Sequence, residues 1–453
     1  MLMAIVLAIT GCAIPARAAA LQTSSRLASP DTTGGRERID SVTALATFDS
    51  AWRTVDASLQ SRGVRRLDWD TVRLELRPAA ARATSNGALR GVIDAMLRRV
   101  GESHFAIMPP SDAAARPAAE RGKAPTLGSA GIAVRFVEGR LAVWRVDSGS
   151  GAARAGVTPG GVVERIDDLI LTPVDARDTV GMRRLTLLTR AMRALAGDPG
   201  TPVHLALRTD AGASREVMFS RDSVRGPVSR FGNLPPLPAT LELRRITLPG
   251  ARCVGVLRFE YWLPPVMAAL DRAVDDVRDC AGVVIDLRGN LGGVAAMVMG
   301  VAGHFLNDTR TLGTMRTGGE EMRFIANPRR ATAEGVAVTP YAGPLAIVVD
   351  GLSASTSEMF AAALQSTRRA RIFGERTAGQ ALPAMATRLP NGDILMHVIA
   401  DFVTPDGTRL EGQGVIPDEI VPLRLAELRA RRDAPLDAAL RWVERARPDI
   451  PPR

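Results

Sequence analysis

Three short apolar runs in the second half of the chain, each bounded by turn residues, constrain the fold more than any other feature. They cover residues 283–287, 345–350 and 370–374, and helical patterns follow the first two over 293–306 and 356–367. Strands that alternate with helices form parallel sheets, because a parallel pair needs a crossover connection. Residues 238–426 are therefore predicted to be an α/β core.

The remainder of the chain divides into segments of different composition. Apolar residues at helical spacing, among them Phe48, Trp52 and Val55, predict an N-terminal helical domain that ends in a strand near 105–108. Short β segments with one amphipathic helix follow. The predicted boundaries are an export signal at 1–20, a linker at 21–37, the helical domain at 38–110, a hinge at 111–126, a β domain at 127–222, and a C-terminal helix and tail at 427–453.

The basic charge of +10 raises the question of a nucleic-acid partner. Lys123 is the one lysine among 58 basic residues, the arginines are spread without a run of like charge, and aromatic residues make up only 4%. A solvated basic surface is therefore the favoured interpretation, and nucleic-acid binding is not expected. No apolar run reaches the roughly 20 residues of a membrane span.

The first residues indicate export. A short apolar run over 2–9 precedes small residues that end near Ala18, which fits a cleaved signal, whereas Ile-Thr-Gly-Cys at 9–12 is similar to a bacterial lipobox. The second route would tether the protein to a membrane through a lipid on Cys12. In an exported protein Cys253 and Cys280 can form a disulfide, but two buried free thiols are the favoured alternative.

Two polar turns stand at the predicted carboxyl ends of parallel strands, where sites form in α/β folds. Arg-Gly-Asn-Leu-Gly-Gly at 288–293 can hold an oxyanion or a phosphate on its N–H groups, or merely pack. Ser-Ala-Ser-Thr-Ser-Glu at 353–358 places a serine at a helix N-terminus, where ordinary helix capping with Glu358 is the alternative. The two turns together favour a catalytic interpretation.

These two segments, with Gly374-Glu375, Thr377, Gly379 and the stretch at 414–418, resemble the landmarks of the tail-specific, or C-terminal processing, serine peptidases. The resemblance implies a ClpP/crotonase-like core of ββα layers. It also implies that Ser355 is the nucleophile, and that the oxyanion donors are the N–H of Gly292 or Gly293 and that of Thr356. No cofactor or metal is expected.

Within 127–222, the segments 151–157, 159–160 and 200–203 resemble a PDZ domain of the kind embedded in bacterial proteases. Such a domain accepts an extended peptide as an added strand and holds its C-terminal carboxylate on backbone N–H groups. The resemblance places that carboxylate near Ala130, Gly131 and Ile132.

The general base is the open question of the mechanism. In the lysine-dyad branch of the family a lysine stands where this chain has Gln380, and a neutral amide accepts no proton near pH 7. Lys123 lies in the predicted hinge, so a serine-lysine dyad is excluded. Histidines are structural in most settings, but the Ser103-His104 pair resembles that of the tricorn-core branch.

The tricorn-core resemblance implies that His104 is the base, oriented by Ser103 and a glutamate for which Glu411 is the best match, with Gln380 lining the site. The predicted function is thus an exported serine endopeptidase that cleaves C-terminal tails of envelope proteins through an acyl-enzyme. The first alternative is an inactive peptidase-like adaptor that only binds peptides. A crotonase-like acyl transferase is a weaker third hypothesis.

Overall fold

A six-stranded sheet forms the centre of the computed structural model, which describes residues 38–64, 68–110, 127–174, 182–209, 212–224, 226–229, 237–248 and 253–446. The strand order is β13-β14-β15-β18-β19-β23, antiparallel between the first two strands and parallel thereafter. The strands are β13 (Leu241–Thr247), β14 (Cys253–Phe259), β15 (Gly282–Asp286), β18 (Leu345–Val349), β19 (Arg371–Gly374) and β23 (Glu419–Ile420). The predicted parallel α/β core is thus present.

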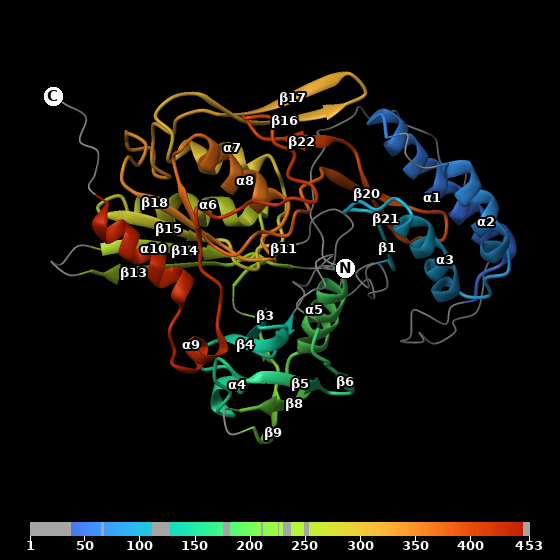
Figure 1. Cartoon of the computed structure of the whole chain (residues 1–453), viewed down its shortest axis with the longest axis horizontal. Coiled ribbons are helices and arrows are strands. Elements are labelled where there is room, and N and C mark those ends of the chain that lie inside the picture. The colour runs from blue at the N-terminus through green and yellow to red at the C-terminus, as the bar shows by residue number, and fades with distance from the viewer. Residues whose placement is uncertain are drawn as a thin grey trace.

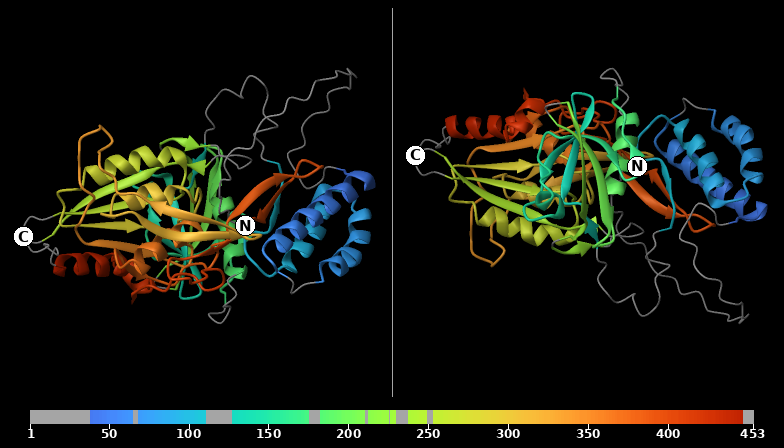
Figure 2. Two further views of the ribbon diagram at one scale, coloured as in Figure 1. Left: turned by 90° about the horizontal axis from the view of Figure 1, so that it is seen from above. Right: turned by 90° about the horizontal axis from the view of Figure 1, so that it is seen from below.

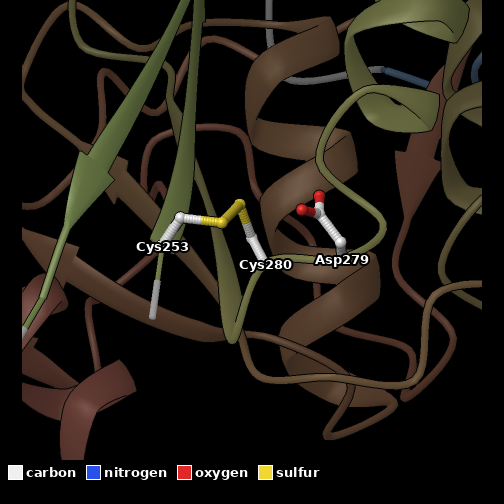
Figure 3. Close-up of side chains that lie close together, drawn as sticks. All are labelled: Cys253, Asp279 and Cys280. Carbon is white, nitrogen blue, oxygen red and sulfur yellow. A yellow bond between two sulfur atoms is a disulfide. The ribbon is translucent and has the colours of Figure 1, made fainter. Parts of the chain in front are cut away.

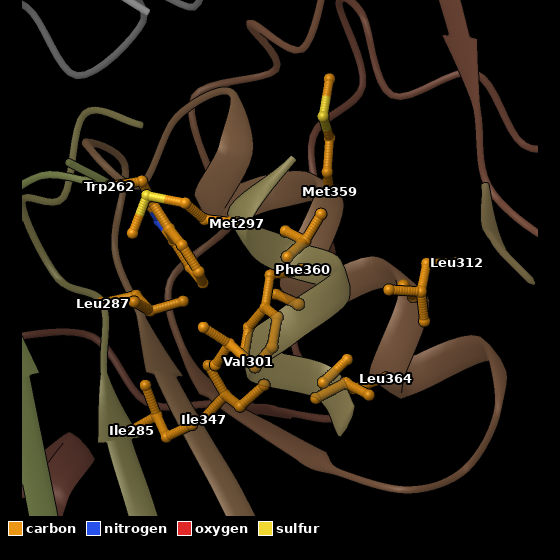
Figure 4. Close-up of a cluster of buried hydrophobic side chains, with 14 of the residues drawn as sticks. Trp262, Ile285, Leu287, Met297, Val301, Leu312, Ile347, Met359, Phe360 and Leu364 are labelled. Atoms are coloured by element: carbon orange, nitrogen blue, oxygen red, sulfur yellow. The ribbon is translucent and has the colours of Figure 1, made fainter. Parts of the chain in front are cut away.

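Helices cover both faces of this sheet (Figure 1). One face packs on α6 (Pro264–Asp275), α7 (Met297–Gly303) and α8 (Thr356–Ser366), and the other packs on α10 (Ala434–Arg445). Side chains alternate between the faces along a strand, so Ile285 and Ile347 join the first cluster, shown in Figure 4, while Val284 joins the second. Burial on both faces explains why these strands are continuously apolar.

The helix predicted over 293–306 is shorter than expected. It begins at Met297, because Gly292 and Gly293 adopt φ values of 93° and 150° and the chain at Gly293 instead forms a parallel bridge with Trp262. The glycine-rich turn is therefore an extended loop held against the preceding segment.

Three helices form the N-terminal part: α1 (Ser41–Ser61), α2 (Trp69–Ala81) and α3 (Asn86–Arg98). Asp40, Asp68 and Ser85 cap their first turns by accepting backbone N–H groups. Beyond α3, β1 (Ala106–Met108) pairs with β21 (Ile394–Val398), which in turn pairs with β20 (Ala384–Arg388). A strand from the front of the chain thus completes a sheet that belongs to the core, and Figure 2 shows the three helices at one end of the molecule.

The β domain between these parts is a second sheet in the order β3-β4-β5-β8-β9, with β6 paired to β5. Its elements are β3 (Ile132–Val137), β4 (Arg140–Val146), α4 (Gly151–Arg154), β5 (Val162–Ile166), β6 (Leu169–Ile170), α5 (Met182–Leu195), β8 (Pro202–Arg208) and β9 (Ser214–Ser220). Its identity as a PDZ domain remains a prediction, as do the domain boundaries.

The remaining elements are short or peripheral. They are β2 (Gly128–Ser129), β7 (Ala196–Gly197), β10 (Asp222–Ser223), β11 (Val228–Ser229), β12 (Leu237–Pro238), β16 (Arg310–Thr317), β17 (Glu320–Ala326), β22 (Asp401–Val403) and α9 (Leu425–Arg429). The predicted signal, linker and hinge, with Cys12 and Lys123, lie outside the described residues. Among the helices that are described, none has the length and apolar character needed to cross a membrane.

The two cysteines of the core are bonded to each other. Cys253 and Cys280 form a disulfide with their Cα atoms 4.7 Å apart, beside Asp279 (Figure 3). The favoured expectation of two free thiols is wrong, because Cys253 opens β14 while Cys280 ends the turn that leads into the adjacent strand β15. Because β14 and β15 pair in parallel, the two cysteines lie side by side at the starting ends of these strands.

Candidate active site

Ser355 lies at the turn between β18 and α8 and is fully buried. Its φ of 57° is in the left-handed region, which is costly for a residue other than glycine and recurs at functional turns. Its N–H lies 2.9 Å from the carbonyl oxygen of Gln380 and 3.0 Å from Glu358 Oε2. The hydroxyl Oγ has no hydrogen-bond partner among the described residues.

The glycine-rich turn packs directly against this serine. A Cβ atom added to Gly292 would lie 2.7 Å from the Cβ of Ser355, so only glycine fits there. The N–H of Gly292 donates to Asn290 Oδ1 at 3.0 Å, which removes it as a candidate oxyanion donor. The N–H groups of Gly293 and Thr356 have no acceptor among the described residues, so of the predicted donors these two stay available.

Glu358 fixes the backbone around Ser355. Its buried carboxylate accepts the N–H of Ser355, of Gly379 and of Gln380, and the hydroxyl of Thr377, at 2.5–3.0 Å. Burial raises the pKa of Glu358 to about 7, and the four donors offset part of that rise. The sequence pattern suggested only a helix-capping role, whereas the carboxylate is the hub that ties the loop at 377–380 to the serine.

The second half of the site comes from the loop after α3. Ser103 Oγ lies 2.5 Å from His104 Nδ1 and donates to Glu411 Oε2 at 3.0 Å. The N–H of Ser103 donates to Glu411 Oε1 at 2.9 Å. Three predicted site residues, two of them from the front of the chain and one from near its end, are thus joined in one hydrogen-bonded line.

One peptide group connects the two halves. The carbonyl of Gln380 accepts the N–H of Ser355, and the N–H of Ala381, in the same peptide unit, donates to Glu411 Oε2 at 3.0 Å. Ser355 and Glu411 therefore bind opposite sides of the 380–381 peptide. Gln380 contributes to the site through its backbone carbonyl and N–H groups. The sequence instead suggested that its side-chain amide lines the site.

Burial controls the protonation of the second half. It lowers the pKa of His104 to about 4, so the imidazole is neutral at pH 7. Burial also raises the pKa of Glu411, against the hydrogen bonds from Ser103 and Ala381. His104 has a φ of 63°, in the left-handed region that is costly for a residue other than glycine.

The other histidines lie elsewhere. His204 is exposed on β8, His304 caps α7 and bonds Asp271, and His397 on β21 bonds the hydroxyl of Thr387 at 3.0 Å. The proposed carboxylate-binding loop of the β domain is partly occupied: the N–H of Ala130 donates to the carbonyl of Leu195, and that of Gly131 donates to Ser129 Oγ. Ile132 opens β3.

A link between the β domain and the core was missed by the sequence argument. Arg135 on β3 donates from Nε to Asp350 Oδ2 at 2.8 Å and from Nη2 to the carbonyl of Arg288. Asp350 Oδ1 accepts the N–H of Gly289, the first glycine of the glycine-rich turn. Asp350, at the end of a predicted strand, was the one sequence signal for this link. Its partner Arg135 comes from the β domain.

With this geometry established, comparison with known families is informative. Residues 253–421 match the model of peptidase family S41. Over these residues the core is similar to this peptidase family. The S41 match contains Ser355, the glycine-rich turn and Glu411, whereas Ser103 and His104 precede it.

Two relatives that match about two thirds of this chain are both named as carboxyl-terminal processing proteases. A carboxy-terminal-processing protease of Bartonella bacilliformis is 27% identical over 314 residues, which are 66% of this chain and 62% of the relative. A carboxyl-terminal-processing protease of Synechocystis sp. is 29% identical over 298 residues, 65% of this chain and 62% of the relative. The matched region thus spans less than two thirds of the length of these relatives.

Solved structures share the fold over nearly the whole chain. The photosystem II D1 C-terminal processing protease aligns with a TM-score of 0.56 and 22% identity, covering 88% of this chain and 97% of that one. The tricorn protease aligns with a TM-score of 0.50 and 17% identity, covering 89% of this chain and 37% of that one. At 22% and 17% sequence identity, the similarity to these structures shows a shared fold only.

Proposed function

We propose that this chain is an exported serine endopeptidase that cleaves polypeptides through an acyl-enzyme on Ser355, with His104 as general base. The observation that carries the proposal is the 380–381 peptide, which binds Ser355 on one side and the Glu411-Ser103-His104 line on the other. A nucleophile and its proton acceptor are thereby built into one hydrogen-bonded frame, although they come from distant parts of the chain.

The line of hydrogen bonds supports one tautomer of His104. If Ser103 Oγ–H donates to the Glu411 carboxylate, its oxygen lone pair accepts the N–H at His104 Nδ1. The lone pair at Nε2 is then free to accept a proton. Ser355 Oγ attacks the scissile carbonyl carbon, its proton passes to Nε2, and the oxyanion forms beside the N–H groups of Gly293 and Thr356.

The acyl-enzyme follows from the same groups. The imidazolium returns its proton to the leaving amine as the peptide C–N bond breaks, and the acyl group stays on Ser355 Oγ. Water then loses a proton to Nε2 and attacks the ester, which releases the acid and restores the serine. Ser355 Oγ makes no hydrogen bond in this structure, in keeping with catalytic contacts that tighten only when substrate is bound.

The other elements of the proposal concern delivery of substrate. The β domain collects unstructured C-terminal tails as an added strand on β3, in the PDZ manner, and presents them to the core. The relatives are named for processing carboxyl termini, which supports this class of substrate. Export, with a tether through a lipid on Cys12 as one processing route, places the activity at the cell envelope.

An inactive peptide-binding adaptor is the second candidate, and the unpartnered Ser355 hydroxyl is the observation in its favour. A fluorophosphonate probe, which bonds covalently to activated serines, separates the two. We expect labelling of the wild type, none of Ser355→Ala, and at least about a 100-fold slower rate for His104→Ala. His204→Ala is the matched control, because that histidine is exposed on the β domain.

Labelling that is absent from a folded wild type, or equally fast in His104→Ala and the wild type, would contradict the peptidase mechanism. Ser103→Ala tests the line of hydrogen bonds separately. It removes the partner of His104 Nδ1 and leaves the imidazole in place, so slower labelling is expected with unchanged thermal unfolding.

A further inference from the structure

A cavity of about 630 Å³ lies at the junction of three parts of the chain, away from Ser355. Its walls come from β4 and the turn after α4 in the β domain, from the edge of the central sheet at β13 and β14, and from the segment between α9 and α10 (Figure 1). Leu428 of α9 and Trp144 of β4 belong to one buried cluster, so these parts are packed together.

The charged lining of the cavity is strongly unbalanced. Three carboxylates line it, from Glu242, Asp286 and Asp433, against six guanidinium groups. The arginines are Arg145, Arg244, Arg258, Arg288, Arg431 and Arg432. The excess of cations makes the interior a favourable place for negative charge.

Ion pairs engage four of the six arginines and leave two without a carboxylate partner among the described residues. Arg145 and Arg244 both pair with Glu242, and Arg145 also pairs with Asp147 and Glu260. Arg288 already engages both Asp286 and Asp433, at 2.6–2.8 Å, and Arg258 shares Asp286. Arg431 and Arg432 are exposed and have no ion pair within 4.0 Å among the described residues.

Two buried guanidinium nitrogens in the lining also have no partner. They are Nε of Arg258 and Nε of Arg145, and Arg258 is only 8% exposed. A buried donor without an acceptor is destabilising, so an acceptor that entered the cavity would be stabilised.

Guanidinium groups are also crowded around Trp144. Those of Arg135, Arg258 and Arg288 lie 4.4–4.8 Å from the centre of its ring. Burial and the repulsion from the neighbouring arginines lower the pKa of Arg258. The ring stabilises this group of cations only in part, since it attracts each cation without neutralising its charge.

We propose that this cavity binds a multivalent organic anion that carries phosphate or carboxylate groups. The planar fork of arginine matches both oxyanions in a bidentate way. The volume is in the range of about 300–1,000 Å³ typical of sites for small organic ligands, and Val146, Val157 and Leu428 supply apolar walls for the body of the molecule. None of the residues that line the cavity lies on β3, the proposed peptide-binding strand.

Such a ligand would bridge the β domain and the core. It would contact Arg145 on β4, Arg258 on β14 and the pair Arg431–Arg432 after α9 at the same time. Bound anion should therefore slow hydrogen exchange of β4 amides, because separation of the domains would break its contacts.

The test uses pyrophosphate and citrate as probes with the full chain in a buffer that contains no other multivalent anion. Calorimetric titration should show saturable binding of at least one probe, and the double variant Arg431→Gln/Arg432→Gln should weaken it at least about tenfold. These two residues are exposed, so the variant should unfold at the wild-type temperature. The matched control is Arg323→Gln, an exposed arginine on β17 that is remote from the cavity.

Which probe binds identifies the oxyanion: pyrophosphate alone indicates a phosphate ligand, and citrate alone a carboxylate ligand. Absence of binding by both probes would overturn the proposal. Equal affinities in the wild type and the double variant would overturn it too, as would an equal loss in Arg323→Gln, which would indicate nonspecific attraction to a basic surface.

Discussion

The two halves of the candidate active site are built in opposite ways. Around Ser355, the residues that fix the backbone come from one short stretch of the chain, since Glu358 bonds Ser355, Thr377, Gly379 and Gln380 at sequence separations of 3 to 22. Around His104, the contacts span the molecule. Ser103 meets Glu411 across 308 residues.

The difference shows that Ser355, the proposed nucleophile, is part of the core, whereas His104, the proposed base, is docked onto it. The docking contacts are a buried ion pair of Arg90 with Asp393, a hydrogen bond from Ser58 to the carbonyl of Val398, and the β1–β21 pairing. Arg62, whose side chain is fully buried, also pairs with Glu102 at 2.6 Å, next to Ser103. Loss of these contacts should inactivate the site without unfolding the central sheet.

Glu358→Gln should have the largest effect, because it damages the half built into the core. The amide nitrogen would replace one carboxylate oxygen and leave two donors without an acceptor. We expect the free energy of unfolding to fall by about 3 kcal/mol and labelling of Ser355 to be lost. Urea denaturation measures the first and the fluorophosphonate probe the second. Glu320→Gln, on the exposed strand β17, is the control. Wild-type stability in Glu358→Gln would show that the carboxylate is not the hub.

Arg90→Leu tests the docked half. Asp393 is fully buried and would lose its ion-pair partner, at a cost of about 3 kcal/mol. Hydrogen exchange should rise in α3 and in β20–β21 and stay slow in β15 and β18. Labelling of Ser355 should slow in parallel, and Asp393→Asn in the same chain should restore part of it. Faster exchange across the whole core would contradict the separation of the two halves.

The pH dependence of Ser355 labelling should show the smallest effect. It tests whether His104 is held in a buried position in the docked half of the site. Since burial lowers the pKa of His104 to about 4, the base stays neutral on acidification from pH 7 to 5, and the rate of labelling should fall by half only near pH 4. An exposed histidine would give a midpoint near its usual 6.5.

The same pKa affects stability. Between pH 6.5 and 4 the unfolded chain binds a proton at His104 that the folded chain does not, so the free energy of unfolding should decrease as the pH falls through this window. His104→Ala should remove that part of the pH dependence. A labelling midpoint near 6.5 would mean that His104 is not held in the buried docked position.

The sequence predicted the local half of the site better than the distant half. The turns at 288–293 and 353–358 could be located from strand ends alone, because parallel strands bring their carboxyl ends to one edge, whereas the choice of Ser355 within the second turn came from family resemblance. Glu411 and the Ser103–His104 pair came from family resemblance. No local sequence pattern indicates that two residues 308 positions apart are in contact in the folded chain.

The other expectations that the structure corrected also depended on contacts between distant or loop residues. The disulfide depends on how β14 and β15 pair, and the start of α7 depends on a bridge between Gly293 and Trp262. The engagement of the Gly292 N–H by Asn290 depends on the course of a loop. Tertiary contacts decided each of these, whereas hydrophobic periodicity was sufficient for α8, β18 and the N-terminal helices.

The three-residue strand β1 has a consequence for the order in which the protein matures. Its partner β21 and the carboxylate of Glu411 leave the ribosome long after the helices that precede β1. A partly synthesised chain can thus contain folded helices and even a buried serine, yet it has no means of orienting the imidazole. The proposed activity should therefore arise only after Glu411 has been synthesised and has bound Ser103.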